Sequence, residues 1–182
     1  MLGSIVLGLG AALGAFAAYV ATRPSHFSIS RSRAIAAPPP VAHAYVNDFR
    51  KWAEWSPWEK RDPALTRHYS GQPSGTGAVY AWKGNRNVGE GRMTITDSRP
   101  PHNVAIRLEF LKPFQQTNAT TFDFAPAGAG TQVSWTMTGE NSFMGKAFSV
   151  FMNMDKVIGA DFEQGLANLD AATAAGAKTP AT

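Results

Sequence analysis

Residues 103–110, NVAIRLEF, alternate apolar side chains with polar or small ones along their whole length. Successive side chains of a β-strand point to opposite faces, so the apolar set from Val104 to Phe110 falls on one face of a strand. Residues 117–125 and 131–138 show the same alternation, and the turn signal PAGAG at 126–130 separates them. The three segments predict consecutive antiparallel strands with one apolar face.

Four more strands are predicted nearer the N-terminus, because short runs with strand character are bounded there by turns that contain glycine or proline. Two short helices, at 41–49 and 50–55, are predicted after the proline run that ends at residue 40, since proline fits the first turn of a helix but not its interior. The sequence therefore predicts seven strands of an antiparallel meander. The four additional strands are residues 26–35, 65–70, 78–83 and 88–98.

A single long helix is predicted at residues 143–171, capped by Asn141 or Ser142. Its apolar side chains recur every three or four residues and form one stripe. An antiparallel sheet with one apolar face needs a cover, and this helix is the available one. The predicted fold class is thus α+β, with a curved seven-stranded antiparallel sheet around a long C-terminal helix. Space for a ligand is expected between sheet and helix, near the short helices.

The first 22 residues carry no charged side chain. Because about 20 helical residues span the roughly 30 Å of a bilayer core, residues 1–22 predict a transmembrane anchor. Arg23, Arg31 and Arg33 follow this segment, and the positive-inside rule then predicts a single-pass protein whose domain lies in the cytoplasm. A signal peptide is the alternative, since residues 15–17 resemble an A-x-A cleavage site, and it would make the domain secreted or periplasmic.

The rest of the chain is expected to form one domain at residues 24–172, which is long enough for a complete hydrophobic core. Residues 173–182 are small and polar and predict a disordered tail. No cysteine is present, which excludes disulfides, thiolate metal sites and a cysteine nucleophile. The net charge is +4 and no run of Lys and Arg exceeds two residues, so nucleic acid is not expected as a partner.

No catalytic residue, metal site or cofactor is assigned from the sequence. The histidines are scattered, whereas a zinc site needs three or four convergent ligands. No G-x-S-x-G nucleophile motif occurs. Four polar residues, His68, Tyr69, Tyr80 and Asn118, are the ones most able to reach a cavity, where one of them could act as a general acid on a bound ketone.

Several short motifs follow one another in a recognisable order: IAAPP at 35–39, VNDF at 46–49, WAEWSPW at 52–58, GTGA at 75–78, GEG at 89–91, TQVSW at 131–135 and FEQGLANL at 162–169. Read with the order of elements, they resemble the SRPBCC superfamily, the START/Bet v1-like proteins that include polyketide cyclases/dehydrases and lipid-transport proteins. The resemblance covers about residues 27–169. It implies a helix-grip fold with a deep cavity between sheet and helix, but no shared reaction.

Large apolar side chains indicate what would line such a cavity. Three tryptophans fall within seven residues, and methionines, which adapt to varied ligands, occur on the sheet and the long helix. Gly159 and Gly165 each cost that helix about 1 kcal/mol relative to alanine, which calls for close helix–sheet contact or room for a ligand. The predicted ligand-binding residues are Trp52, Trp55, Trp58, Tyr80, Trp82, Met93, Phe110, Phe122, Trp135, Met137, Phe151 and Met154.

Three functions remain open from the sequence. The first is binding or transport of a hydrophobic small molecule or lipid, held beside the membrane by the N-terminal segment. The second is an enzyme of the polyketide cyclase/dehydrase kind, against which the lack of a convergent polar set argues. The third is a non-catalytic interaction or stress-related domain whose cavity is filled by its own side chains.

Overall fold

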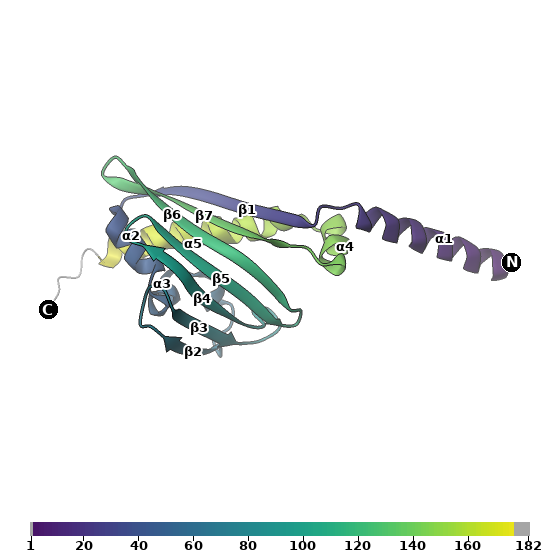
Figure 1. The fold of residues 1–182 in the computed structure, drawn as a ribbon, viewed down its shortest axis with the longest axis horizontal. Helices are drawn as coiled ribbons and strands as arrows, with labels where there is room; N and C mark the ends of the chain where they lie inside the picture. Colours follow the sequence, from purple (N-terminus) through teal and green to yellow (C-terminus); the bar gives the residue numbers. More distant parts are fainter. Residues whose placement is uncertain (1, 177–182) are drawn as a thin grey trace.

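The computed structural model describes residues 2–176, and the side chains from residue 8 onward. Its strands form one antiparallel sheet in the order β1-β7-β6-β5-β4-β3-β2 (Figure 1). All seven predicted strands are confirmed, and no strand end is displaced by more than two residues. The strands are β1 (His26–Ile35), β2 (Thr66–Gly71), β3 (Ala78–Lys83), β4 (Glu90–Arg99), β5 (Asn103–Lys112), β6 (Gln116–Ala127) and β7 (Gly130–Glu140).

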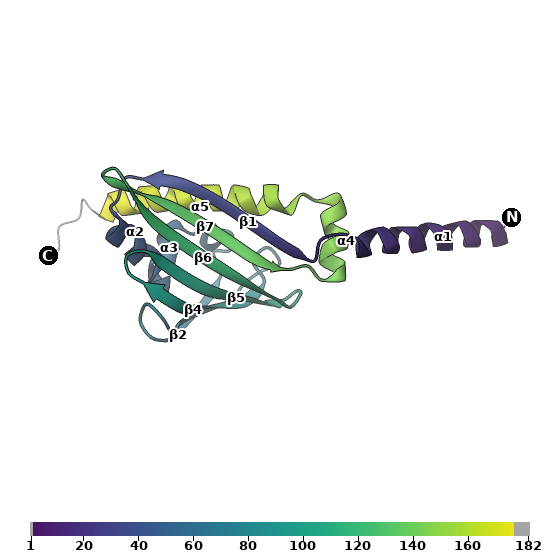
Figure 2. The same ribbon diagram turned by 45° about the horizontal axis from the view of Figure 1, so that its top comes forward.

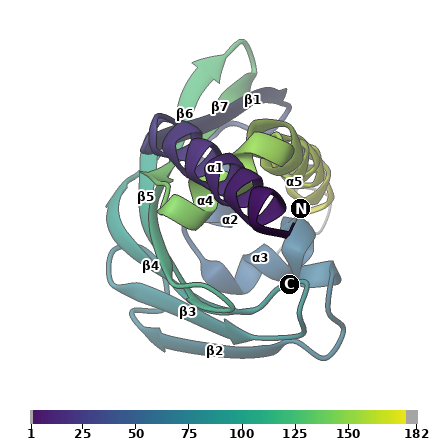
Figure 3. The ribbon, with the colours of Figure 1, turned by 90° about the vertical axis from the view of Figure 1, so that its right-hand side faces the viewer.

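The described helices lie at both ends of the chain and between the first two strands. The predicted short helices correspond to α2 and to η1 with α3. Figure 3 shows the sheet curving around α3 and α5, which lie on its concave side. The helices are α1 (Leu2–Ala21), α2 (Pro39–Val46), α3 (Trp52–Trp55), α4 (Phe143–Phe151) and α5 (Met154–Gly176), with the 3₁₀ turns η1 (Phe49–Lys51) and η2 (Pro57–Lys60).

The hydrophobic core fills the concave side at the end where α2 and α3 lie. Val104 of β5 is paired with Phe122 of β6, and both side chains are fully buried, on the apolar faces that the alternation within each strand predicted. Trp55 of α3 stands edge-on to Phe122, with 6.0 Å between the ring centroids, and is also fully buried. This end of the fold is therefore closed by large aromatic side chains.

The C-terminal helix is broken where one continuous helix was predicted. Met152 has an extended backbone with φ −132° and ψ 125°, which ends α4. Asn153 then accepts a hydrogen bond from the backbone N–H of Lys156 at 3.0 Å and so caps the start of α5. Ser142 caps α4 by accepting from the N–H of Gly145 at 3.1 Å. α5 continues to Gly176, past the start of the predicted tail, and residues 177–182 lie outside the described part of the chain.

The N-terminal segment does not meet the prediction of a transmembrane anchor. Within the described residues, no helix combines the length and the apolar character that a bilayer crossing needs. The predicted anchor at residues 1–22 and the single-pass localisation with a cytoplasmic domain are therefore wrong. The alternative interpretation of this segment was a signal peptide, which would make the domain secreted or periplasmic, and no finding supports it.

The end of α1 instead contacts the rest of the protein. Val20 has no exposed surface, and the ring centroids of Phe16 and of Phe151 on α4 lie 5.9 Å apart. Figure 2 shows α4 at the end of the sheet, between α1 and α5. Apolar side chains of α1 thus pack on the domain.

Candidate ligand-binding cavity

A cavity of about 1330 Å³ lies between the concave face of the sheet and the helical segments η2, α4 and α5. Every described strand except β2 contributes side chains to its lining, and the exposed surface inside it is mainly apolar. Small-molecule sites in proteins commonly enclose about 300–1,000 Å³. This cavity therefore has room for a ligand of at least drug size.

Ten of the twelve predicted ligand-binding residues line this cavity. Trp55 and Phe122 do not, because they are fully buried in the core beneath the lining. The ten lining residues are Trp52, Trp58, Tyr80, Trp82, Met93, Phe110, Trp135, Met137, Phe151 and Met154.

The cavity lies farther from the short helices than the sequence suggested. Among the described residues, Trp52 is the one member of α2 and α3 that lines it, because the core occupies that end. The lining extends instead to α4 and to the loop between β5 and β6, where Phe114 and Gln115 contribute. The break between α4 and α5, which the sequence did not reveal, lies at this open end.

An aromatic stack forms the wall between the core and the cavity. The indole of Trp135 on β7 lies parallel to the ring of Phe162 on α5, with 4.1 Å between centroids and 6° between planes. Trp58 of η2 stands edge-on to Trp135 at 5.7 Å. Offset-stacked and edge-on pairs are favoured arrangements of aromatic rings, so they fix the position of this wall.

Both interrupting glycines of α5 are explained by close contact with the sheet. A Cβ atom at Gly165 would lie 2.8 Å from Cζ3 of Trp135 and 3.3 Å from Cδ of Pro57. A Cβ atom at Gly159 would collide with the guanidinium of Arg31. The missing side chains therefore let α5 lie directly against Trp135 and Arg31.

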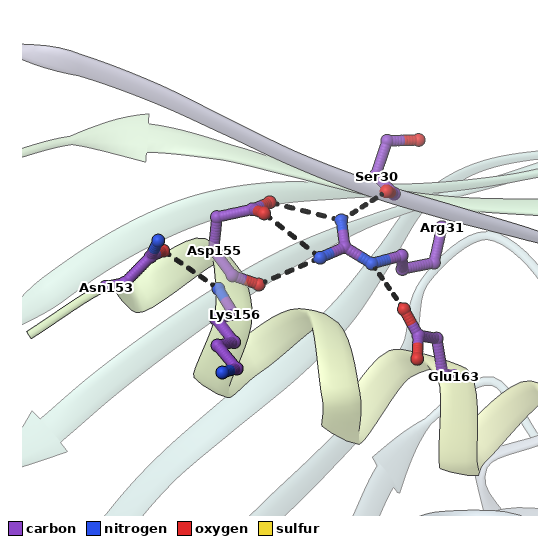
Figure 4. Close-up of polar contacts among 6 residues, drawn as sticks. All are labelled: Ser30, Arg31, Asn153, Asp155, Lys156 and Glu163. Carbon is purple, nitrogen blue, oxygen red and sulfur yellow. Dashed lines mark hydrogen bonds and ion pairs between the residues drawn. The ribbon is translucent and has the colours of Figure 1, made fainter.

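Arg31 holds the first half of α5 to the edge strand β1. Its Nε donates to Glu163 at 2.8 Å, and its terminal nitrogens donate to the carboxylate of Asp155 at 3.1 and 3.0 Å (Figure 4). The remaining N–H groups donate to the backbone carbonyls of Ser30 and Asp155. The hydrogen bonds from Arg31 lower the pKa of Asp155. All five donors of the guanidinium are thus used within the protein.

A second polar group in the cavity wall connects η2 with the strands β2 and β3. Glu59 of η2 accepts a hydrogen bond from the Tyr80 hydroxyl at 2.5 Å and one from Nε of Arg67 at 2.6 Å. Burial, and then this bond to Glu59, raise the pKa of Tyr80 above its usual range. Tyr80 therefore keeps its proton and shares it with Glu59 in a hydrogen bond, while Arg67 balances the charge of the carboxylate.

Exposed apolar side chains surround the opening of the cavity. Phe148 and Phe151 on α4 are 52% and 80% exposed, and Phe114 in the β5–β6 loop is 67% exposed. All three also belong to the lining. An apolar molecule that enters here would meet apolar surface before it reaches the interior.

Several lining residues were not among the predicted set. Thr120 lies on the same face of β6 as Phe122 and Phe124, because side chains two residues apart in a strand share a face. This alternation was the signal that could have identified it. Glu59 carried no such signal, because its burial depends on Tyr80 and Arg67 from other elements.

The four polar residues that were expected to reach a cavity divide into two pairs. Tyr80 and Asn118 line the cavity. His68 and Tyr69 lie on β2 and are not part of its lining. The edge strand β2 is thus too far along the sheet to contribute to this site.

Comparison with known proteins agrees with this architecture. A family model described as "Polyketide cyclase / dehydrase and lipid transport" matches residues 26–174. No curated protein matches the sequence.

Solved structures are similar in fold at low sequence identity. The protein of unknown function SA2116 from Staphylococcus aureus gives a TM-score of 0.63 at 9% identity, over 85% of this chain and 97% of the other. TTHA0849 from Thermus thermophilus gives 0.57 at 18% identity, over 84% and 100% of the two chains. The di-domain ARO/CYC StfQ from the steffimycin biosynthetic pathway gives 0.61 at 13% identity, over 85% of this chain and 53% of the other. At these identities the likeness shows the fold alone.

Proposed function

The chain belongs to the polyketide cyclase/dehydrase and lipid transport family, and on that premise we propose that it binds a hydrophobic small molecule between the sheet and α5. The observation that carries this proposal is the cavity of about 1330 Å³ with mainly apolar walls. Removal of apolar ligand surface from water favours binding by about 25 cal/mol per Å². A cavity of this size with mainly apolar walls can remove much of the surface of an apolar ligand from water.

The polar contacts in the cavity wall favour a binding role over a catalytic one. A general acid must be free to donate its proton to the substrate. The Tyr80 hydroxyl already donates to Glu59, and Arg67 neutralises that carboxylate. This group therefore serves as a structural support in the proposed function.

Blocking the cavity covalently tests the proposal in the full chain. The protein contains no cysteine, so one introduced thiol can be labelled selectively. Leu108 of β5 lines the cavity, whereas Leu111 on the same strand is exposed and lies outside the lining. The variants Leu108→Cys and Leu111→Cys, each labelled with pyrenyl maleimide, form a matched pair.

The readout is the affinity for the apolar dye 1-anilinonaphthalene-8-sulfonate, measured by fluorescence titration. The labelled Leu108→Cys variant should lose at least about tenfold in affinity, which corresponds to about 1.4 kcal/mol. The labelled Leu111→Cys variant should bind as the unmodified protein does. Equal dye binding by both labelled variants would contradict a binding site inside the cavity.

A further inference from the structure

Three buried side-chain atoms of the cavity lining have no hydrogen-bond partner in the described part of the protein. Two of them, Nε1 of Trp135 and Oγ1 of Thr120, lie on the concave face of the sheet. These side chains are only 3% and 5% exposed. The third, Nε of Arg23, belongs to the segment between α1 and β1. Buried polar groups are almost always hydrogen-bonded, so the unpaired groups on the sheet point to a partner that enters the cavity.

The sheet register places Thr120 and Trp135 side by side. Thr120 is paired with Met137, and Phe122 with Trp135, across the antiparallel strands β6 and β7. Thr120 and Trp135 are therefore diagonal neighbours on the concave face, a spacing that an aromatic side chain can still bridge.

A third donor belongs to the same part of the wall. Asn118 precedes Thr120 by two residues and so lies on the same face of β6. Its Nδ2 donates to the sulfur of Met137 at 3.6 Å, and a thioether is a weak acceptor. Its Oδ1 accepts from Gln116 at 3.0 Å. The amide nitrogen of Asn118 thus retains capacity to donate to a ligand.

The chemistry of these groups selects the kind of atom that they can bind. The indole N–H of Trp135 can only donate, so its partner must be a hydrogen-bond acceptor. The hydroxyl of Thr120 can donate to the same atom. An oxygen atom with two lone pairs meets both requirements at once.

The arginines nearest to this wall are engaged by the protein, and Arg23, which also lines the cavity, lies outside the sheet. Arg31, which is paired with Trp135 in the sheet, uses every N–H within the protein. Arg61 of the lining donates to Asp161, and Arg23 lies before the start of β1, eight positions along the chain from Arg31. An uncharged oxygen acceptor therefore fits this position better than a carboxylate, whose burial would need a countercharge.

We propose that the ligand is an apolar molecule with a carbonyl oxygen, which accepts hydrogen bonds from Trp135 and Thr120. This inference rests on the proposed function and specifies the ligand class of the same cavity. It assigns Thr120 and Trp135 as specificity-determining residues. The remaining lining then recognises the apolar body of the molecule.

The test compares 9-fluorenone with fluorene, two tricyclic molecules that differ in a carbonyl oxygen at one ring carbon. Thr120→Val removes the hydroxyl and keeps the shape of the side chain. It should weaken fluorenone binding about fivefold, the usual range for one hydrogen bond, and leave fluorene binding unchanged. Trp135→Phe removes the indole N–H and should show the same selectivity. Thr121→Val, on the opposite face of β6, is the matched control and should change neither affinity.

Infrared spectroscopy of bound fluorenone provides a second, direct readout. Its carbonyl stretch should lie at lower wavenumber than in hexane, and should shift back toward the hexane value in Thr120→Val. Equal effects of the variants on both ligands, an unshifted stretch, or tighter binding of fluorene-9-carboxylate than of fluorenone would overturn the carbonyl assignment while ligand binding itself still stands. If neither ligand nor the apolar dye binds the unmodified protein, the proposed function fails instead.

Discussion

Gly165 lies where α5 packs directly on the indole of Trp135. Alanine is the better helix former by about 1 kcal/mol, so Gly165→Ala would stabilise an isolated helix. In the protein its Cβ would lie 2.8 Å from Trp135, and overpacking costs about 1–3 kcal/mol. We expect a net loss of about 1 kcal/mol in the free energy of unfolding, measured by urea denaturation.

Gly145 of α4 is the control for this substitution. A Cβ atom there would approach no atom closer than 3.4 Å. Gly145→Ala should therefore be neutral or stabilising by up to about 1 kcal/mol. A stabilising Gly165→Ala would contradict the close packing of α5 on the sheet.

The sequence showed on which face of the sheet a residue lies, but not whether its side chain is buried in the core or lines the cavity. Strand alternation placed Met93, Trp135 and Met137 on the concave face, and they do line the cavity. The same alternation placed Phe122 there too, yet this ring is covered by Trp55 from another element. Depth depends on contacts between distant parts of the chain, which periodicity does not encode.

At the scale of elements, the strands were predictable and the break in the last helix was not. Alternation and turn residues are local, so strand positions follow from short windows of sequence. The apolar pattern at Phe151 and Met154 runs on through the break. The one local signal of the break was Asn153, because asparagine is a preferred N-cap residue and this one caps the first turn of α5.

The attachment of α5 to β1 depends on the Arg31 contacts and should depend on pH. Arg31→Gln removes the charge that faces Asp155 and should lower the thermal unfolding midpoint at pH 7. The pKa of Asp155 is lowered in the native state by Arg31. The stabilisation is therefore complete above the ordinary aspartate pKa of about 3.9, and is lost as the pH falls through the lower native value.

Thermal unfolding of both proteins between about pH 7 and pH 2.5 measures this dependence. The difference between them should begin to shrink below about pH 4, where Asp155 of the unfolded chain takes up a proton, and shrink further as the native carboxylate is protonated at its lowered pKa. Arg33→Gln is the control, because Nε of Arg33 lies 3.8 Å from Asp170 and its side chain is 49% exposed. A difference that stays constant with pH would show that the ion pair does not attach α5.

At the scale of the whole molecule, the protein has a filled end and an open end. The aromatic core under α2 and α3 closes one, and the cavity reaches the other beside α4 (Figure 1). The sequence predicted the curved sheet and its helical cover, but it placed the space near the short helices and a membrane anchor at the N-terminus. Both errors have one origin, since local composition does not show which apolar surfaces pack on one another.

Native mass spectrometry of the full chain, followed by organic extraction, tests the central claim of an apolar ligand most directly. We expect a stoichiometric adduct that is released into organic solvent as an apolar molecule, and a carbonyl group in that molecule would agree with the contacts proposed for Trp135 and Thr120. A bare protein mass, together with no binding of 1-anilinonaphthalene-8-sulfonate, would contradict it.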